Sequence, residues 1–252
     1  MMDRSGKKGR TNALRRGAGL LLVFLLGVNL PSAEAAALSV KEILKKTESH
    51  YQQTQAFTAR FRQWTTASAA RSMASTEASG TLYYQKPRRM HWQYDKPEPQ
   101  SFVANNQLAW LYVPSEKTIS FYDANTFFAS PLVQTLFDGV IELKNHFEIS
   151  LDSKQSSKQT AVLKLVPRKE DPTLQSLYLW IELDSYRIQI IESHDALGNT
   201  NRVALESQRV VSSLDPKLFQ LDIPPSTVLL DTDGRELSPA DVEMLKKKLT
   251  IQ

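Results

Sequence analysis

The spacing of hydrophobic positions along the chain changes near residue 55 from a helical period to a strand period. Before that point Ser39 and Glu42 form a capping box, which predicts a helix that begins there and ends at about residue 54. The apolar positions of this helix fall near one stripe: Val40, Ile43, Leu44, Thr47 and Tyr51. The helix is therefore amphipathic, and its apolar face needs a partner.

From Phe57 onward, apolar and polar residues alternate in short segments, which is typical of strands buried on one side. Prolines and Asn pairs separate these segments and mark turns between antiparallel neighbours. After a polar connection at 65–79 we expect strands near 80–85, 90–94, 100–104, 108–113 and 118–122. Later alternation predicts further strands around Ile149, Leu163, Leu179, Ile188 and Val203, which makes about eleven in all.

The basic stretch Lys86-Pro-Arg-Arg89 lies between two of these strands. Because proline cannot donate a hydrogen bond to a central ladder, Pro87 places the stretch at the tip of a hairpin. Aromatic strands with basic flanks also occur in platforms that bind single-stranded nucleic acid. The net charge of the chain without residues 1–35 distinguishes a hairpin tip from a nucleic-acid platform.

Two helices interrupt or follow the strands. Ser130 as a cap, Pro131 at the first helical position and Gly139 at the end predict a short apolar helix within 125–139, lying over the sheet. A terminal helix capped by Ser238 carries Val242, Leu245 and Leu249 on one stripe. The pattern favours a mainly β (α+β) fold, a long antiparallel meander that curls round a helix. Periodicity does not distinguish a filled barrel from a hollow one.

Residues 1–35 combine a basic region, a short uncharged apolar run and Ala33-Glu34-Ala35, the pattern of a cleaved secretory signal peptide. The alternative is a membrane anchor, but the run is shorter than the roughly 20 apolar residues that a spanning helix needs. This segment holds six of the 31 basic and two of the 27 acidic side chains, so the remainder carries 25 of each. A formally neutral mature chain argues against nucleic acid as a partner. With no cysteine, the exported protein must be stabilised by its core alone.

Catalytic chemistry has no clear signature in this sequence. The four histidines lie in unrelated contexts without metal-ligand spacing, and no phosphate loop or nucleophile elbow is present. Ser193-His194-Asp195 cannot converge as a triad, because consecutive strand residues point to opposite faces. We therefore expect no catalytic residues, no metal site and no cofactor.

The order of these motifs resembles the LolA family of periplasmic lipoprotein carriers. The family's F-x-A-x-F strand and its G-x-L-x-x-x-[RK]-P-x-x-x-x-W-x-Y hairpin match Phe57 to Phe61 and Gly80 to Tyr94. Further matches are Pro97, the strand at 108–112, the helix at 131–139, the turn at 195–199 and the segment 214–224. The resemblance spans roughly residues 38 to 230.

This resemblance implies an incomplete antiparallel β-barrel of about eleven strands with a helical lid over an apolar cavity. The lipid-binding cavity would be lined by Leu82, Tyr84, Met90, Trp92, Phe102, Trp110, Tyr112 and Phe121. The lid would carry Phe127, Phe128, Leu132 and Leu136. Lys86 occupies the position of the family's lid latch, which is usually an arginine, and offers a point charge in place of a planar fork.

The resemblance also implies a function and a set of partners. Residues 36–230 would form the carrier domain and 231–252 a C-terminal helical extension. The expected partners of this periplasmic monomer are acylated lipoproteins, an inner-membrane lipoprotein-releasing ABC transporter and, where present, an outer-membrane lipoprotein receptor. The alternatives are a lipid or glycolipid export factor and an envelope-stress sensor of the same fold. An esterase would need a nucleophile and a base that the sequence does not provide.

Overall fold

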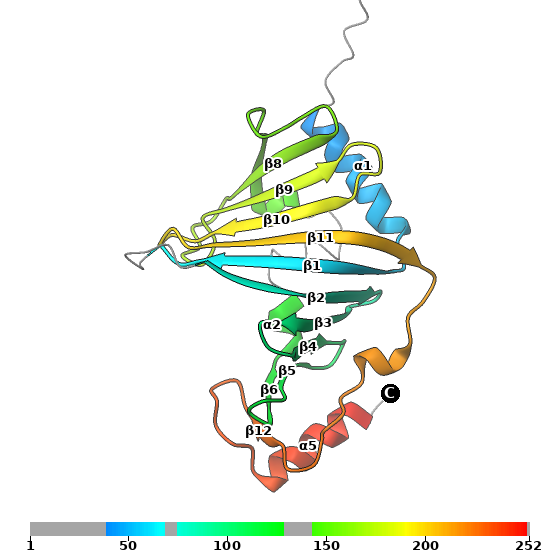
Figure 1. The fold of residues 1–252 in the computed structure, drawn as a ribbon, viewed down its shortest axis with the longest axis vertical. Helices are drawn as coiled ribbons and strands as arrows, with labels where there is room; N and C mark the ends of the chain where they lie inside the picture. Colours follow the sequence, from blue (N-terminus) through cyan, green and yellow to red (C-terminus); the bar gives the residue numbers. More distant parts are fainter. Residues whose placement is uncertain (1–38, 69–74, 129–142, 251–252) are drawn as a thin grey trace, which may run out of the picture. The chain divides into compact units, whose positions relative to one another are not determined.

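In the computed structural model, the described residues are 39–68, 75–128 and 143–250. They form one twelve-stranded sheet, with helices before, between and after its strands (Figure 1). The strands are β1 (Ala56–Thr66), β2 (Ser75–Gln85), β3 (Arg89–Lys96), β4 (Gln100–Ala104), β5 (Ala109–Val113), β6 (Thr118–Tyr122), β7 (Phe147–Leu151), β8 (Thr160–Pro167), β9 (Ser176–Glu182), β10 (Ile188–His194), β11 (Thr200–Val211) and β12 (Val228–Leu230). The helices are α1 (Val40–Gln53), α2 (Ala124–Phe128), α4 (Leu143–His146), η2 (Pro216–Phe219) and α5 (Pro239–Thr250).

The sheet consists of two antiparallel meanders joined at their first and last strands. Its order is β12-β6-β5-β4-β3-β2-β1-β11-β10-β9-β8-β7. β1 and β11 are far apart in the sequence but lie side by side (Figure 1). Phe61 of β1 lies opposite Leu205 of β11. Within the described residues β7 and β12 stand at the two ends of the order, so the sheet is open. The predicted mainly β (α+β) class and the incomplete form of the sheet are confirmed.

The structure contains one strand that the sequence pattern did not predict. β12 has only three residues and pairs parallel to β6, with Leu229 opposite Ile119, whereas the other pairs are antiparallel. A three-residue segment is too short to show alternation, so no local pattern indicated it. The predicted count of about eleven strands is therefore one short.

The expected polar connection at 65–79 is wrong at both of its ends, at 65–66 and 75–79, while 69–74 lie outside the described residues. β1 continues to Thr66 and β2 begins at Ser75, and these two residues lie opposite each other. On its other side Thr66 lies opposite Thr200 of β11. The end of β1 is thus paired on both sides, and Ser75 to Ala78 are held extended by their pairing with β1. Strand propensity depends on such neighbours, so this stretch is extended despite its weak preference for strands.

Both predicted helix starts are confirmed. Ser39 and Glu42 form the capping box of α1, with a distance of 2.9 Å from the Ser39 backbone nitrogen to the Glu42 carboxylate. Ser238 and Asp241 make the equivalent pair of bonds at α5. Of the short helix expected within 125–139, the part from 129 onward, with its predicted cap Ser130, falls outside the described residues. None of the described helices is long and apolar enough to cross a membrane.

Candidate functional site

One face of the sheet carries a continuous apolar cluster, and we call it the inner face. Residues directly opposite each other on paired strands point to the same side. Phe57 lies opposite Tyr84, which lies opposite Met90, and all three are buried. The apolar side of α1, with Ile43, Leu44 and Tyr51, belongs to the same cluster. The partner that the amphipathic helix needs is therefore this face.

The structure divides the predicted cavity residues between the two faces of the sheet. Five of them lie on the inner face: Leu82, Tyr84, Met90, Trp92 and Phe102. The other three lie on the opposite, outer face: Trp110, Tyr112 and Phe121. The expectation that the aromatic alternation continues on one face is therefore wrong.

The turn between β4 and β5 accounts for this division. The Asn105 side chain accepts hydrogen bonds from the backbone N–H groups of Gln107 and Leu108, at 2.9 and 3.0 Å. This turn places Val103 opposite Trp110, while Phe102 faces Leu111. Trp92 and Phe102 are directly paired, so Trp110 points to the other side of the sheet from both of them.

The outer face of β4–β6 has a core of its own, which we call the second core. Its buried members are Val103, Leu108, Trp110, Ile119, Phe121 and Leu229. The segment after β11 supplies the residues packed against them, together with Tyr112: Leu221, Ile223, Leu237, Val242 and Leu245. The C-terminal extension is thus part of the packed fold, and Trp110 and Phe121 are core residues beneath it.

On the inner face, aromatic rings are stacked and only partly covered. The Phe61 ring lies over Gly80 and makes edge contacts with Trp92 and Tyr94, at centroid distances of 4.8 and 4.9 Å. Phe61 is fully buried, whereas Trp92, Tyr94 and Phe102 are half-buried. Partly exposed rings on a buried apolar floor form a surface suited to hydrocarbon chains. Sequence reasoning did not assign Phe61 and Tyr94 to the site, although their alternation is visible.

The inner face becomes polar near Tyr94. The Tyr94 hydroxyl donates to the Gln63 side chain at 3.2 Å, and Gln63 donates to Asn201 at 2.9 Å. Burial raises the pKa of Tyr94, so this hydroxyl stays protonated at neutral pH. Tyr51, near the end of α1, accepts a bond from the backbone N–H of Ile188, and burial raises its pKa to about 12. Both groups act as neutral hydrogen-bonding groups.

The part of the expected lid that the structure describes is α2. Its Phe127 ring lies 4.8 Å from the Phe102 ring of the inner face, and its Phe128 is buried in the same cluster. Leu132 and Leu136 lie outside the described residues. α2 therefore covers the inner face next to Phe102.

Lys86, the residue at the predicted latch position, holds the end of α1. Its ammonium group donates to the carbonyl oxygens of Tyr51 and Gln52, at 2.7 and 3.1 Å. Positive charge at a helix C-terminus is favourable, because the unpaired carbonyls there carry partial negative charge.

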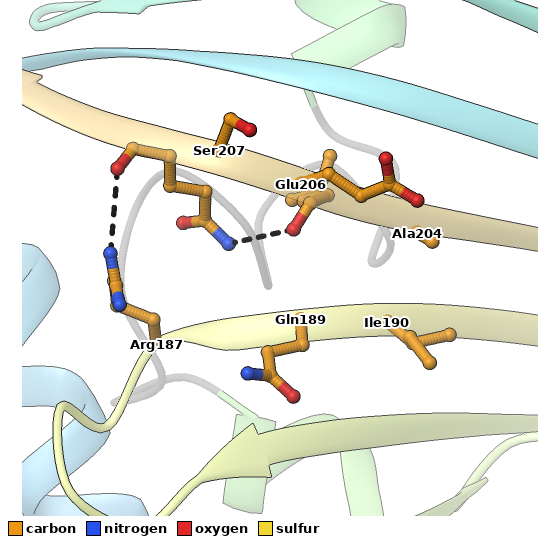
Figure 2. A pocket seen from close by; sticks show the side chains of 8 residues that line it. Arg187, Gln189, Ile190, Ala204, Glu206 and Ser207 are labelled. Carbon is orange, nitrogen blue, oxygen red and sulfur yellow. Dashed lines mark hydrogen bonds between the residues drawn. The ribbon is translucent and has the colours of Figure 1, made fainter.

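A pocket of about 420 Å³ lies where β10 and β11 separate (Figure 2). Arg187 donates to the backbone oxygen of Gln208 at 3.4 Å, and the Gln208 side chain donates to that of Ile188 at 2.8 Å. These side-chain bonds bridge the two strands beyond the last backbone pair, Ile190 with Ala204. The remaining lining residues are Gln189, Leu205, Glu206 and Ser207. This mixed polar lining is unlike the inner face.

The described residues do not assemble a catalytic or metal centre. His194 pairs with Glu192 at 2.7 Å, while Ser193 lies opposite Asn201 on the other side of the sheet, and Asp195 bonds to Asn199. Among the residues that the structure describes, no three His, Asp or Glu side chains gather as metal ligands.

The sequence of this chain matches a known protein family. The model of the family "Outer membrane lipoprotein carrier protein LolA" matches residues 52–222, and the chain belongs to this family. An outer-membrane lipoprotein carrier protein of Methylococcus capsulatus is 29% identical over 153 residues, covering 60% of this chain and 70% of the relative. One of Halorhodospira halophila is 25% identical over 223 residues, covering 88% and 99%. Among solved structures, a LolA superfamily protein from Nitrosomonas europaea has a TM-score of 0.41 and 13% identity, covering 73% of this chain and 99% of that protein.

Proposed function

We propose that this protein is a periplasmic carrier that shields the acyl chains of lipoproteins and moves them from the inner to the outer membrane. The observation that supports it most is the inner face, where half-buried Trp92 and Phe102 lie on a buried apolar floor under α2. Membership of the LolA family supports the same role.

The physical need for such a face follows from the cargo. Each buried methylene is worth about 0.8 kcal/mol, so a triacylated anchor cannot leave a membrane for water without a shield. The residues that we propose to touch the chains are Leu82, Tyr84, Met90, Trp92 and Phe102, with Phe127 and Phe128 from α2. We add Phe61 and Tyr94, which frame Trp92. Trp110, Tyr112 and Phe121 are left out, because they belong to the second core.

The carrier must also release its cargo. Ligand binding shifts a conformational equilibrium only by the difference in affinity between its states. α2 is a suitable place for that difference, because its Phe127 ring contacts the Phe102 ring of the inner face. Lid residues Leu132 and Leu136 and a latch role for Lys86 remain part of this proposal.

The proposed carrier works in the periplasm and has partners in both membranes. Residues 1–35 act as a cleaved signal peptide, and the mature chain works as a periplasmic monomer without enzymatic activity. Its partners are acylated lipoproteins, a lipoprotein-releasing ABC transporter in the inner membrane and, where present, a lipoprotein receptor in the outer membrane.

Recovery of the exported protein with its ligand tests the proposal. The protein is purified from the periplasm without detergent, and bound molecules are identified by native and lipid mass spectrometry. We expect a complex with one acylated lipoprotein, which is released to outer-membrane vesicles. A phospholipid or glycolipid as the only ligand would favour the export factor. A protein with no bound lipid and no uptake of an acylated peptide would contradict the carrier role.

A further inference from the structure

The tip of the β2–β3 hairpin holds two cationic side chains that reach different helices. Lys86 binds the last carbonyls of α1, as described above. Two residues later, the Arg88 guanidinium lies over the ring of Phe128 in α2, with Cζ 4.7 Å from the ring centroid. We propose that Arg88 is the positioning residue that clamps α2 over the inner face, an inference that rests on the carrier function proposed above.

The backbone of Arg88 indicates that its side chain matters. Its φ is +48°, in the left-handed region where a side chain is unfavourable and glycine or asparagine is the usual choice. A turn that needed only this backbone shape would be more stable with glycine. An arginine at this position is explained if its guanidinium contributes a contact that offsets the strain.

Arg88 contacts α2 through a cation–π stack on Phe128 and through a long, weak hydrogen bond to Asn125. Cation–π stacking on a buried ring such as Phe128 is favourable because the guanidinium is shielded from water on one side. The Arg88 Nη2 atom lies 3.5 Å from the Asn125 side-chain oxygen, at the long limit of a hydrogen bond. Asn125 and Phe128 lie three residues apart on α2, so one guanidinium touches both ends of this short helix.

A buried donor opposes the clamp. Among the described residues, Arg88 Nε is buried and has no hydrogen-bond partner. An unpaired buried donor destabilises the state that buries it. The closed position of α2 is thus favoured by the stacked ring and disfavoured by Nε. Because one contribution favours the closed position and the other disfavours it, we infer that the clamp can open and close, which is what exchange of α2 contacts for a ligand requires.

The clamp is connected to the binding face through one pair of rings. Phe128 touches Phe127 at a centroid distance of 5.2 Å, and Phe127 touches Phe102 at 4.8 Å. A ligand that displaces Phe127 from Phe102 therefore also disturbs the ring beneath Arg88.

Hydrogen exchange on the ligand-free exported protein tests the clamp directly. Arg88→Met and Arg88→Gly should accelerate amide exchange in residues 124–128 about threefold to tenfold, as expected from losing one cation–π contact. Arg88→Lys should have an intermediate effect, because it keeps the charge and loses the planar stack. The matched control is Arg89→Met: Arg89 pairs with Gln85 through the backbone, but within the described residues its side chain makes no hydrogen bond, ion pair or ring contact.

The glycine variant distinguishes a clamp from a general contribution to stability. Arg88→Gly relieves the left-handed strain, so its unfolding temperature should stay equal or rise while α2 exchanges faster. In a Phe128→Leu background, Arg88→Met should no longer accelerate exchange, because the ring through which it acts is gone. Exchange rates that do not differ between the Arg88 and Arg89 variants would overturn the proposal. So would an Arg88→Met effect that is unchanged without the Phe128 ring.

Release of a fluorescent acylated peptide separates this proposal from the carrier function. If the protein carries acyl chains, Arg88→Met should release the peptide about threefold to tenfold faster than the Arg89→Met control. Faster exchange in 124–128 with no peptide binding by the unaltered protein would support the clamp and contradict the carrier role. Normal peptide binding with unaltered exchange and release would contradict the clamp alone.

Discussion

At the scale of single residues, Gly80 shows how closely the inner face is packed. A Cβ atom at this position would lie 2.0 Å from the Gln93 carbonyl oxygen and 2.7 Å from the Phe61 ring. Because the first neighbour is backbone, it cannot move away without breaking the β2–β3 pairing. We expect Gly80→Ala to lower the free energy of unfolding by about 3 kcal/mol or to prevent folding. Denaturant unfolding measures this.

Gly234→Ala is the matched control for this prediction. Gly234 has a left-handed φ of +78° and nothing within 4 Å of its missing Cβ. Its cost should be about 1 kcal/mol, from backbone strain alone. Equal losses in the two variants would mean that crowding by Phe61 and Gln93 is unimportant.

Two tryptophans on opposite faces allow the binding face to be separated from the core. Trp92 is half-buried on the inner face, whereas Trp110 is 3% exposed in the second core. We expect Trp92→Asp to cost about 1–2 kcal/mol and to abolish acyl-peptide binding, since its carboxylate can stay hydrated. Trp110→Asp should cost about 4 kcal/mol, because it buries an unpaired charge.

Thermal unfolding and fluorescent-lipid binding on the same samples test this pair. A Trp92→Asp protein that binds acyl peptide normally would remove Trp92 from the cargo site. A Trp110→Asp protein that remains fully stable would contradict the second core.

At the scale of elements, the sequence predicted what local chemistry determines. The caps at Ser39 and Ser238 and the hairpin around Pro87 are set by a few neighbouring residues, and all three are as predicted. The division between Trp92 and Trp110 was not predictable in this way. Both faces of β4 and β5 carry apolar residues, so alternation alone does not show which residues lie on the inner face. The turn formed by the hydrogen bonds of Asn105 determines this.

Long-range contacts around the binding face were also not predictable from local sequence patterns. The pairing of β12 with β6 and the stacking of Arg88 on Phe128 both join segments that are 40 or more residues apart. β12 is also too short to show a periodicity of its own. Sequence pattern identified Phe127 and Phe128 as apolar residues above the sheet, but gave no sign of the cation above them. Long-range packing, which depends on the assembled sheet, supplies that information.

The C-terminal extension provides a prediction at this scale. Val242 of α5 packs against the second core, whereas Met244 is 64% exposed. We expect Val242→Asp to lower the free energy of unfolding by about 2 kcal/mol and to increase binding of a dye specific for exposed apolar surface. Met244→Asp should change stability by about 0.5 kcal/mol or less. Equal effects of the two variants would contradict the packing of α5 on this face.

At the scale of the whole molecule, the sheet carries an apolar layer on each face, and the two layers differ in how completely they are covered. The inner layer holds half-buried rings that can exchange contacts, while the second core is closed by the chain that follows β11. Only 217 residues remain if the signal peptide is removed at Ala35, and they contain no disulfide. The second core therefore stabilises the part of the sheet whose inner side we propose to bind acyl chains.

The stability of the whole protein should depend on pH through His50 and His91, two histidines whose pKa is lowered by burial. Burial lowers the pKa of His91, with partial opposition from the backbone of Leu218, and burial together with the charge of Arg187 lowers the pKa of His50. A histidine whose pKa is lower in the folded state takes up its proton first in the unfolded chain. Stability should therefore fall as the pH drops below the unfolded value of about 6.5.

Carboxylates do not account for a loss in that range. The pKa values of Glu182 and Asp231 are lowered by hydrogen bonds in the folded protein, so their contribution is lost only as the pH falls through about 4.5 and below. We expect the unfolding temperature, measured by calorimetry, to decrease between pH 7.5 and 5.5. The decrease should become smaller in the double variant His50→Gln, His91→Gln and stay unchanged in His146→Gln, which replaces an exposed histidine at the end of α4. A pH dependence that persists in the double variant would show that other groups control stability in this range.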